Sequence, residues 1–578
     1  MYFNLFLRPH SGELKMQMYE LQRKVGHDLG FKSTIFLGMD FLKDPEMVEK
    51  CKYDRDTYGD EIAVWLTSDG KAGGGQVWLI RKEDKKRVVK NAIDAYIDAF
   101  GYAPKSVGNY VMDADLIEVV KEYCPEVEAC VAGCFEEGVK VFHGCNNSWY
   151  LFSEGMSWGP WYPSKTHSIR PAKNEDDWSG VVAVPHLSRD LVLGYENRND
   201  FFASHPANAQ RGLANDGYNH DYDFNLCDQY RMQQDFNDGM SYYQMHVSPG
   251  WLSRNFNIID PDEITQKLYL ETLEYIAELR DKGEIEAVTF SEFASEYKKA
   301  TPIGKATVGF AKDILMGSGK QYYWIFDPSY RVLVDTFQGG SIGDLRAYAG
   351  EYAAVTGPDA KNGRYHYNTY PYIIQSQYRT GYKTHSQDGS RTTLIMTHGN
   401  ENLDMCDYNT TVESISRTKT NCQLILKPVD VKFSDGFTVK LQTVYDFENG
   451  GDILITRRVI EMSDDSADFK VQEYVKASYG FTEYAEDMKD ITLYCDGEKV
   501  IDYTYRNIEF KKQGGDYVSA VIPDITTEVK LCPQSQADTV SVKEGNLFGP
   551  FFTLKADYNI TNDTKEVKTW LRLSKTQA

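Results

Sequence analysis

The strongest constraint on the fold of this chain is a change of hydrophobic pattern at about residue 320. Before it, short apolar runs alternate with stretches of helical periodicity. After it, apolar and polar residues alternate, and turn signals such as Asp435-Gly436 and Asn449-Gly450 recur. Strand–helix repeats favour a parallel sheet, whereas alternation with hairpin turns favours antiparallel sheets. Since 578 residues also exceed what one hydrophobic core supports, the chain predicts two domains of different class.

The first domain is predicted over residues 1–300 as an α/β domain, a distorted (β/α)7-type barrel. Helical segments, notably 12–29, 83–100 and 113–123, separate several of its apolar runs. A long insertion at 143–240, rich in Trp, Tyr, Asn and Asp, interrupts this pattern. The glycine-containing segment 301–319 is predicted to be a crossover linker. The second domain, residues 320–578, is predicted to be all-β and sandwich-like.

Charge and composition exclude several classes of function. The net charge is -22, and no basic stripe is present that could follow a phosphate backbone, so we expect no nucleic-acid partner and no membrane partner. No run approaches the roughly 20 apolar residues that span a bilayer. The chain opens directly on a strand-like run, so a periplasmic or secreted location, which we expect, requires a signal peptide that has been removed. A cytoplasmic location stays open, and the oligomeric state is not predicted.

Four segments carry a resemblance to a known family. They are Ser33-Thr34-Ile35-Phe36-Leu37-Gly38, Gly59-Asp60-Glu61-Ile62-Ala63-Val64-Trp65, Met245-His246 and Ala287-Val288-Thr289-Phe290-Ser291-Glu292-Phe293. In order and spacing they resemble strand motifs of the glycoside hydrolase/deacetylase superfamily, in particular NodB-like polysaccharide deacetylases. The two-domain layout also resembles gut-bacterial members of that superfamily without an assigned activity. The resemblance implies a barrel and a carbohydrate substrate.

The deacetylase metal site that this resemblance implies is altered at its ligand positions. The family has an Asp-Asp pair at the end of the first strand and two histidines on the third. Here Arg8 and Pro9 take the Asp-Asp positions, while Trp65 and Asp69 take the histidine positions. Neither Arg nor Trp can coordinate a metal ion, so we predict no metal and no cofactor, and the ordinary deacetylase mechanism is disfavoured.

Glycoside hydrolysis needs two facing carboxylates instead, and the sequence offers several. Asp113 follows a predicted strand at a helix N-terminus, and Asp190 follows another predicted strand. We predict both as catalytic, although a helix cap for Asp113 and an arginine pair for Asp190 explain them as well. Glu154 and Asp216 are further candidates for the acid. Glu61 lies near a strand start, which favours a structural role.

Histidine and aromatic residues complete the predicted site. His246 is predicted as catalytic, because its motif places it at the carboxyl end of a strand, where barrel enzymes keep their sites. We predict substrate binding by residues at other strand ends or in the aromatic insertion: Arg8, His10, Tyr110, Trp65, His143, Trp158, Trp161 and His186. For the tryptophans a small satellite core is the alternative, and for the histidines a local hydrogen bond.

Three functions follow from these residues. The first is a glycoside hydrolase acting on an oligo- or polysaccharide through carboxylates at the barrel mouth. The second is a carbohydrate-binding protein without catalysis. The third is a metal-dependent deacetylase with a rearranged site, for which His10, His143, His186 and His246 would have to converge on one ion.

Overall fold

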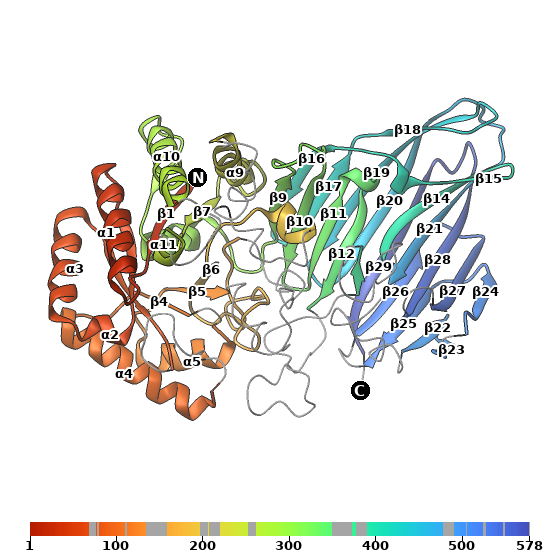
Figure 1. Cartoon of the computed structure of the whole chain (residues 1–578). Helices are drawn as coiled ribbons and strands as arrows, with labels where there is room; N and C mark the ends of the chain where they lie inside the picture. The colour runs from red at the N-terminus through yellow and green to blue at the C-terminus, as the bar shows by residue number, and fades with distance from the viewer. Residues whose placement is uncertain are drawn as a thin grey trace. The chain divides into compact units, whose positions relative to one another are not determined.

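The computed structural model describes most of the chain and divides it into two units, which meet in sequence between Ile303 and Gly304. The described residues are 1–68, 77, 80–109, 112–133, 159–196, 206, 220–252, 262–348, 373–376, 390–477, 491–504, 506–523, 527–546 and 550–576. Figure 1 gives the element labels used from here on.

A parallel sheet forms the first unit. Its strands are β1 (Tyr2–Leu7), β2 (Ser33–Leu37), β3 (Glu61–Trp65), β4 (Ser106–Gly108), β5 (Ala129–Gly133), β6 (Val182–Pro185), β7 (Tyr242–Met245) and β8 (Glu286–Ala287). The strand order is β6-β5-β4-β3-β2-β1-β7, and β8 also pairs with β1. Most of these strands are buried along their whole length, as expected for a parallel sheet covered on both faces. This curved sheet confirms the predicted α/β barrel class.

Helices connect the strands and cover the sheet (Figure 1). They are α1 (Glu13–Asp28), α2 (Met39–Leu42), α3 (Pro45–Tyr58), α4 (Lys82–Phe100), α5 (Ala114–Tyr123), α7 (Leu191–Glu196), α9 (His220–Met232), α10 (Asp262–Asp281) and α11 (Phe290–Ala300). Local sequence sets their ends. Asp44 caps α3, Pro45 occupies its first turn, and Gly59 ends it with φ of 80°. Thr289 and Glu292 form a capping box at α11.

One face of the parallel sheet encloses an aromatic core. Phe6 on β1, Phe36 on β2 and Trp65 on β3 pack there with small or branched residues of β5 and β6. Helix α11 contributes Phe290 and Phe293 to the same cluster. Because these side chains fill the interior at close packing, the barrel has a solid core beneath its carboxyl edge.

The second unit consists of antiparallel sheets, which confirms the predicted all-β class. A five-stranded sheet contains β9 (Thr307–Lys312), β10 (Gln321–Asp327), β11 (Tyr330–Asp335), β12 (Ser341–Ala347) and β13 (Ile374–Gln375). A six-stranded sheet contains β14 (Arg391–His398), β15 (Glu401–Asp404), β21 (Phe469–Ala477), β24 (Glu509–Gln513), β27 (Thr539–Asn546) and β28 (Pro550–Ile560). The segment predicted as a linker therefore includes a strand, since β9 lies within 301–319.

The ten-stranded sheet is the largest in this unit. Its strands are β16 (Val412–Arg417), β17 (Asn421–Leu426), β18 (Val429–Lys432), β19 (Thr438–Glu448), β20 (Asp452–Met462), β22 (Thr492–Cys495), β23 (Glu498–Asp502), β25 (Val518–Ile522), β26 (Thr527–Pro533) and β29 (Glu566–Lys575). The predicted hairpin at Asn449-Gly450 joins β19 to β20, which pair along almost their full length.

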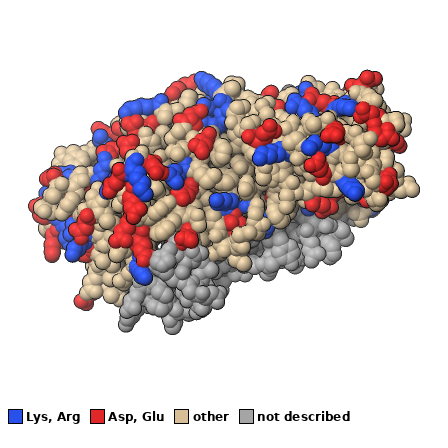
Figure 2. Space-filling model, turned by 90° about the horizontal axis from the view of Figure 1, so that it is seen from above, with Lys and Arg blue, Asp and Glu red and all other residues tan. Residues whose placement is uncertain are grey.

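Charged side chains of both signs are interspersed over the face seen in Figure 2, and no extended basic stripe crosses it. None of the described helices has both the length and the apolar character needed to cross a membrane.

Candidate functional site at the carboxyl ends of the strands

Four predicted site residues lie at the carboxyl edge of the parallel sheet. Arg8 follows β1, Trp65 ends β3, His186 follows β6 and His246 follows β7. Parallel strands end at a common edge, so these side chains come together although they are far apart in sequence. All four are buried, with exposed fractions of 0 to 4%.

The two histidines pack around Phe6 of β1. The Phe6 ring centroid lies 4.4 Å from that of His246 and 5.4 Å from that of His186. The two imidazole centroids are 4.5 Å apart. Trp65 contacts the same group, with its ring 5.8 Å from that of His186. The structure thus brings together His186, His246 and Trp65, which sequence reasoning proposed separately.

Arg8 links this cluster to the partly exposed His10. Its guanidinium carbon lies 4.3 Å from the centroid of the Trp65 ring, which is cation–π geometry. The Arg8 Nε donates a hydrogen bond of 3.1 Å to His10 Nε2. In neutral His10 the proton therefore resides on Nδ1, which makes Nδ1–H a hydrogen-bond donor at the edge of the cluster.

His246 has the opposite tautomer. Its Nδ1 lies 3.3 Å from the carbonyl oxygen of Phe6, and since a carbonyl only accepts, Nδ1 donates this bond. Nε2 then carries a lone pair, and it has no hydrogen-bond partner among the described residues. Burial, together with the nearby charge of Arg8, lowers the pKa of His246 to about 3. Burial and the same guanidinium lower the pKa of His10 to about 2. Both rings are therefore neutral near pH 7.

These residues do not suit the metal ion of a deacetylase. Arg8 lies on Trp65 at the altered ligand positions, and neither side chain can donate a lone pair to a metal. His10 already uses Nε2 to accept from Arg8. In the described part of the chain no group of three or more His, Cys, Asp or Glu is placed to hold a metal ion. The cluster instead offers a cation, a ring donor and a ring acceptor.

Asp113, predicted as a catalytic carboxylate, is held by two structural contacts. Its Oδ1 accepts from the backbone N–H of Leu116 at 3.0 Å, so it caps α5. Its Oδ2 is 2.5 Å from Nζ of Lys85, and both side chains are almost fully buried. Desolvation raises the pKa of Asp113, although Lys85 opposes the shift. This geometry matches the helix-cap alternative, and a catalytic role for Asp113 stays a prediction.

Asp190 occupies an equivalent place at the start of α7. Its Oδ1 accepts from the backbone N–H of Leu193 at 3.0 Å, and its Oδ2 accepts from the hydroxyl of Tyr222 at 2.9 Å. The side chain is 2% exposed. Glu61 is also bonded, because it accepts from Ser106 and from the backbone of Ser291. Each of these carboxylates therefore stabilises the ends of helices or strands in this conformation.

Two tryptophans predicted to stack on sugar are buried in the described structure. Trp65 is 0% exposed and Trp161 is 2% exposed. The indole N–H of Trp161 donates to the carbonyl of Ser168 at 2.9 Å. Trp65 belongs to the aromatic core of the parallel sheet, and substrate binding by either ring stays a prediction. Other predicted residues lie outside the described part of the chain: Asp69, Tyr110, His143, Glu154, Trp158 and Asp216.

Gln244 is a site residue that sequence reasoning missed. Its Nε2 donates to the carbonyl of His186 at 2.5 Å, and its Oε1 accepts from Tyr242 at 2.6 Å. Its backbone exchanges two hydrogen bonds with Ser188, at 2.9 and 3.0 Å. These bonds join β6 and β7, the two ends of the strand order. The sequence contained a signal for Gln244, because this polar residue lies on the same strand face as Tyr242 and His246 in an otherwise apolar strand.

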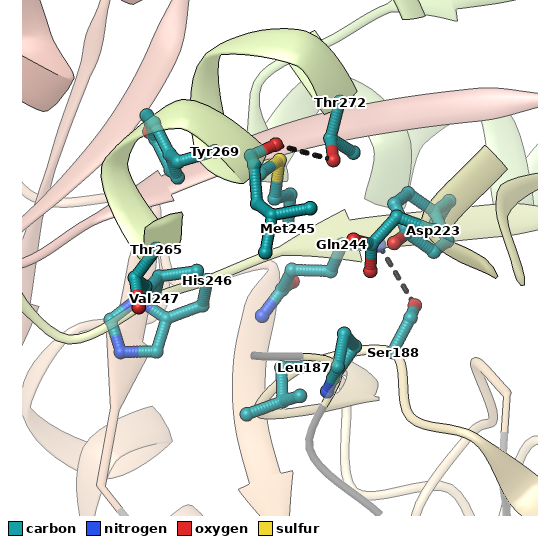
Figure 3. Close-up of a pocket in the computed structure, with 13 residues that line it drawn as sticks. Leu187, Ser188, Asp223, Gln244, Met245, His246, Val247, Thr265, Tyr269 and Thr272 are labelled. Atoms are coloured by element: carbon teal, nitrogen blue, oxygen red, sulfur yellow. Dashed lines mark hydrogen bonds between the residues drawn. The ribbon is translucent and has the colours of Figure 1, made fainter. Parts of the chain in front are cut away.

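A small cavity lies beside this junction (Figure 3). It measures about 40 Å³ and is bordered by Ser188, Gln244 and His246 on one side and by Thr265, Tyr269 and Thr272 of α10 on the other. This volume holds one or a few water molecules and is too small for a sugar ring. The described cavity is therefore a small, partly open pocket next to the cluster.

Comparisons with known proteins assign no single activity to this chain. Residues 37–319, slightly less than half of the chain, match a family described as "Domain of Unknown Function with solved-structure structure (DUF3863)". No curated protein matches the sequence. A crystal structure from Parabacteroides distasonis, described as a glycoside hydrolase/deacetylase, is similar at 14% identity with a TM-score of 0.41, covering 60% of this chain and 81% of that chain.

Two further structures are less similar. A 4-alpha-glucanotransferase from Thermococcus litoralis is 10% identical with a TM-score of 0.30, covering 100% of this chain and 99% of that chain. A Mycobacterium smegmatis protein described as a polysaccharide deacetylase is 13% identical with a TM-score of 0.31, covering 52% and 92%. At such scores these similarities support no statement about activity, so the function has to be derived from this chain's own side chains.

Proposed function

We propose that this chain is a carbohydrate-active protein that binds an oligo- or polysaccharide at the carboxyl edge of its parallel sheet. The observation that carries the proposal is the convergence of Arg8, His10, His186 and His246 at that edge. A neutral imidazole acceptor, an imidazole donor and a guanidinium are groups that hydrogen-bond sugar hydroxyls. Their place is where α/β barrels keep their sites.

Glycoside hydrolysis is the first candidate reaction. His246 Nε2 carries a lone pair in a desolvated pocket, where it can accept a hydrogen bond from a sugar hydroxyl or a water molecule. Because its pKa is lowered to about 3, proton abstraction in this hypothesis falls to a carboxylate. Asp113 and Asp190 remain the candidate carboxylates of this hypothesis, each at the start of the helix that follows a strand. A productive pair would have to exchange its present structural bonds for contacts with substrate.

Carbohydrate binding without catalysis is the second candidate. A specific observation favours it, because both oxygens of Asp113 and both oxygens of Asp190 already accept hydrogen bonds that hold secondary structure. A glycosidase needs at least one carboxylate that is available to the scissile bond.

A screen against neutral and acidic polysaccharides tests the proposal. Binding is measured by affinity electrophoresis, and turnover by new reducing ends and by released acetate. We expect at least one glycan to bind the wild type and to bind His246→Gln at least tenfold more weakly. The matched control is His398→Gln, since His398 lies on β14 of the second unit. Reducing ends would support hydrolysis, binding without turnover would support the second candidate, and no binding to any glycan would contradict the proposal.

A further inference from the structure

The cavity of Figure 3 lies where β6 and β7, the two ends of the strand order, are joined by the bonds between Gln244 and Ser188. We call it the seam pocket. His246 borders this pocket and also belongs to the imidazole cluster, since its ring centroid lies 4.5 Å from that of His186. The pocket is partly open. A glycan held at His246 therefore has the seam pocket within reach of one exocyclic group.

The size of the seam pocket limits the group that it can take. Its volume of about 40 Å³ has room for roughly three water-sized probes, because one such probe needs about 10–15 Å³. A sugar ring does not fit this space, whereas the carbon and oxygen of an exocyclic hydroxymethyl group do. Hexopyranoses carry this group at C5, and pentopyranoses lack it.

The seam pocket has an apolar side that suits the methylene carbon of a hydroxymethyl group. Leu187, Met245 and Leu268 border the pocket, and they are 3 to 8% exposed. A ligand carbon that contacts these side chains is removed from water, and this burial contributes favourably to binding.

The same lining carries polar groups that can pair with the hydroxyl. Tyr269 of α10 is 4% exposed, and its hydroxyl has no hydrogen-bond partner among the described residues. The amide of nearby Gln22 on α1 donates instead to the carbonyl of Val247 at 2.8 Å. His246 Nε2 also has no partner in the described part of the chain. Since a hydroxyl both donates and accepts, a ligand hydroxyl in the pocket can satisfy the phenol or the imidazole lone pair.

The charge of the lining favours a neutral ligand group. At neutral pH, Asp223 in the first turn of α9 is the one charged side chain among the described residues that border the pocket. A ligand carboxylate would be buried beside this acidic residue, with no basic side chain in the described lining, and such burial costs free energy. The hydroxymethyl group of a hexose therefore suits the pocket better than the carboxylate of a uronate.

From these observations we propose that the seam pocket is a subsite for the hydroxymethyl group of a neutral hexopyranose, held through Tyr269 and His246. The inference rests on the proposed carbohydrate function and deepens it by naming the class of sugar. Hexose, pentose and uronate glycans differ in the substituent at C5. The pocket that receives this substituent is then the part of the site that determines specificity.

Glycans that differ only at C5 test this inference separately from the proposed function. Cellohexaose and xylohexaose share a β-1,4 backbone, and xylose lacks the hydroxymethyl group. For any other hexose glycan found in the screen, the matched ligands are its 6-deoxy derivative and its C6-oxidised uronate. We expect the hexose form to bind about tenfold or more tightly than each matched ligand. Equal binding, or binding of pentose or uronate glycans alone, would overturn the inference and leave the proposed function standing, whereas no binding to any glycan would overturn both.

Substitution of Tyr269 assigns the preference to the seam pocket. Tyr269→Phe keeps the ring and removes the hydroxyl. Tyr275→Phe is the matched control, since Tyr275 lies on the same helix and its hydroxyl donates to Asp228 at 3.0 Å. We expect Tyr269→Phe to reduce the ratio of hexose to 6-deoxy affinity about fivefold or more, and Tyr275→Phe to leave it unchanged.

An undiminished affinity ratio in folded Tyr269→Phe would overturn the inference. Thermal unfolding verifies that the variant is folded. We expect it to unfold at the wild-type temperature or above, because the hydroxyl that is removed bonds to no described residue. Should Tyr269→Phe fail to fold, the wild-type ratio of hexose to 6-deoxy affinity decides the outcome.

Discussion

At the scale of single residues, a glycine and a tryptophan together define the interior of the barrel. Gly108 ends β4, and a Cβ built there would lie 2.8 Å from Cζ3 of Trp65 and 3.0 Å from Phe36. The glycine therefore leaves the space that the indole occupies. The Arg8 guanidinium stacks on the Trp65 ring, so the position of the proposed site depends on the contact between Gly108 and Trp65.

We expect Gly108→Ala to lower the free energy of unfolding by about 1–3 kcal/mol, the usual effect of overpacking a core. It should also weaken glycan binding, since displacement of Trp65 moves Arg8. Denaturant unfolding measures the first effect. Gly159→Ala is the control, because among the described residues no atom lies within 4 Å of a Cβ built there. Equal stability of Gly108→Ala and wild type would contradict the packing described here.

The buried imidazole of His246 makes stability depend on pH. Its pKa is lowered from 6.5 to about 3 in the folded state, so the unfolded state takes up a proton first as pH falls. The contribution is fully present above pH 6.5 and is lost between pH 6.5 and about 3. We expect the unfolding free energy of wild type to fall by about 1 kcal/mol per pH unit more steeply than that of His246→Gln in this window. Parallel curves from pH 6.5 to 4.5 would show that His246 is not buried as a neutral ring.

Individual side chains were the hardest feature to predict from sequence. The sequence alone predicted where His246 lies and showed that Arg8 and Trp65 replace metal ligands. Both depend only on which residue type stands at the end of a strand. Whether a tryptophan faces a sugar or a core depends on neighbours from other strands, such as Gly108 and Phe36 around Trp65. No local pattern contains that information, so the burial of Trp161 and Trp65 could not be predicted from the sequence.

At the scale of elements, the start of α5 depends on the buried pair of Asp113 and Lys85. Asp113→Asn keeps an oxygen that can cap the helix and leaves Lys85 as an uncompensated buried charge. We expect a loss of about 3–5 kcal/mol of stability, and partial recovery in Asp113→Asn/Lys85→Met. Calorimetric unfolding measures both. The double variant also separates the two roles of Asp113. If the role is structural, glycan cleavage should recover together with stability. If the carboxylate is catalytic, cleavage should stay absent.

The junction of β6 and β7 depends on Gln244. Gln244→Met keeps the side-chain length and removes the bonds to His186 and Tyr242, leaving buried polar groups unsatisfied. We expect a loss of about 2–4 kcal/mol and faster hydrogen exchange at the amides of Ser188 and Gln244. Gln442→Met is the control, since the Gln442 side chain donates to exposed Glu413 within the ten-stranded sheet of the second unit. Unchanged hydrogen exchange at both amides would show that Gln244 does not stabilise the junction of β6 and β7.

The positions of helices and strands were predicted better than the environments of side chains, because the spacing of apolar residues reflects which residues are buried. Strands β1, β2 and β3 and helices α4 and α5 lie close to the predicted segments. The segment 301–319 was predicted as a linker because of its glycines, yet Gly309 lies inside β9, where it pairs with Trp324. A glycine is tolerated inside a strand when a neighbouring strand forms hydrogen bonds with its backbone. The local sequence around Gly309 does not show which strand will pair with it.

At the scale of the whole molecule, the two-class organisation follows from one change of pattern and is confirmed by the parallel and antiparallel sheets. We propose that Arg8, His10 and His246 form a sugar-binding site at the carboxyl edge of the parallel sheet.

The most direct test is a crystal structure of the protein with a glycan identified by the binding screen, measured at wavelengths that reveal bound metals by anomalous scattering. We expect a sugar at the carboxyl ends of β1 and β7, within hydrogen-bond distance of His10 or His246. A metal ion coordinated by strand residues at this edge, or a glycan bound only elsewhere on the chain, would contradict it.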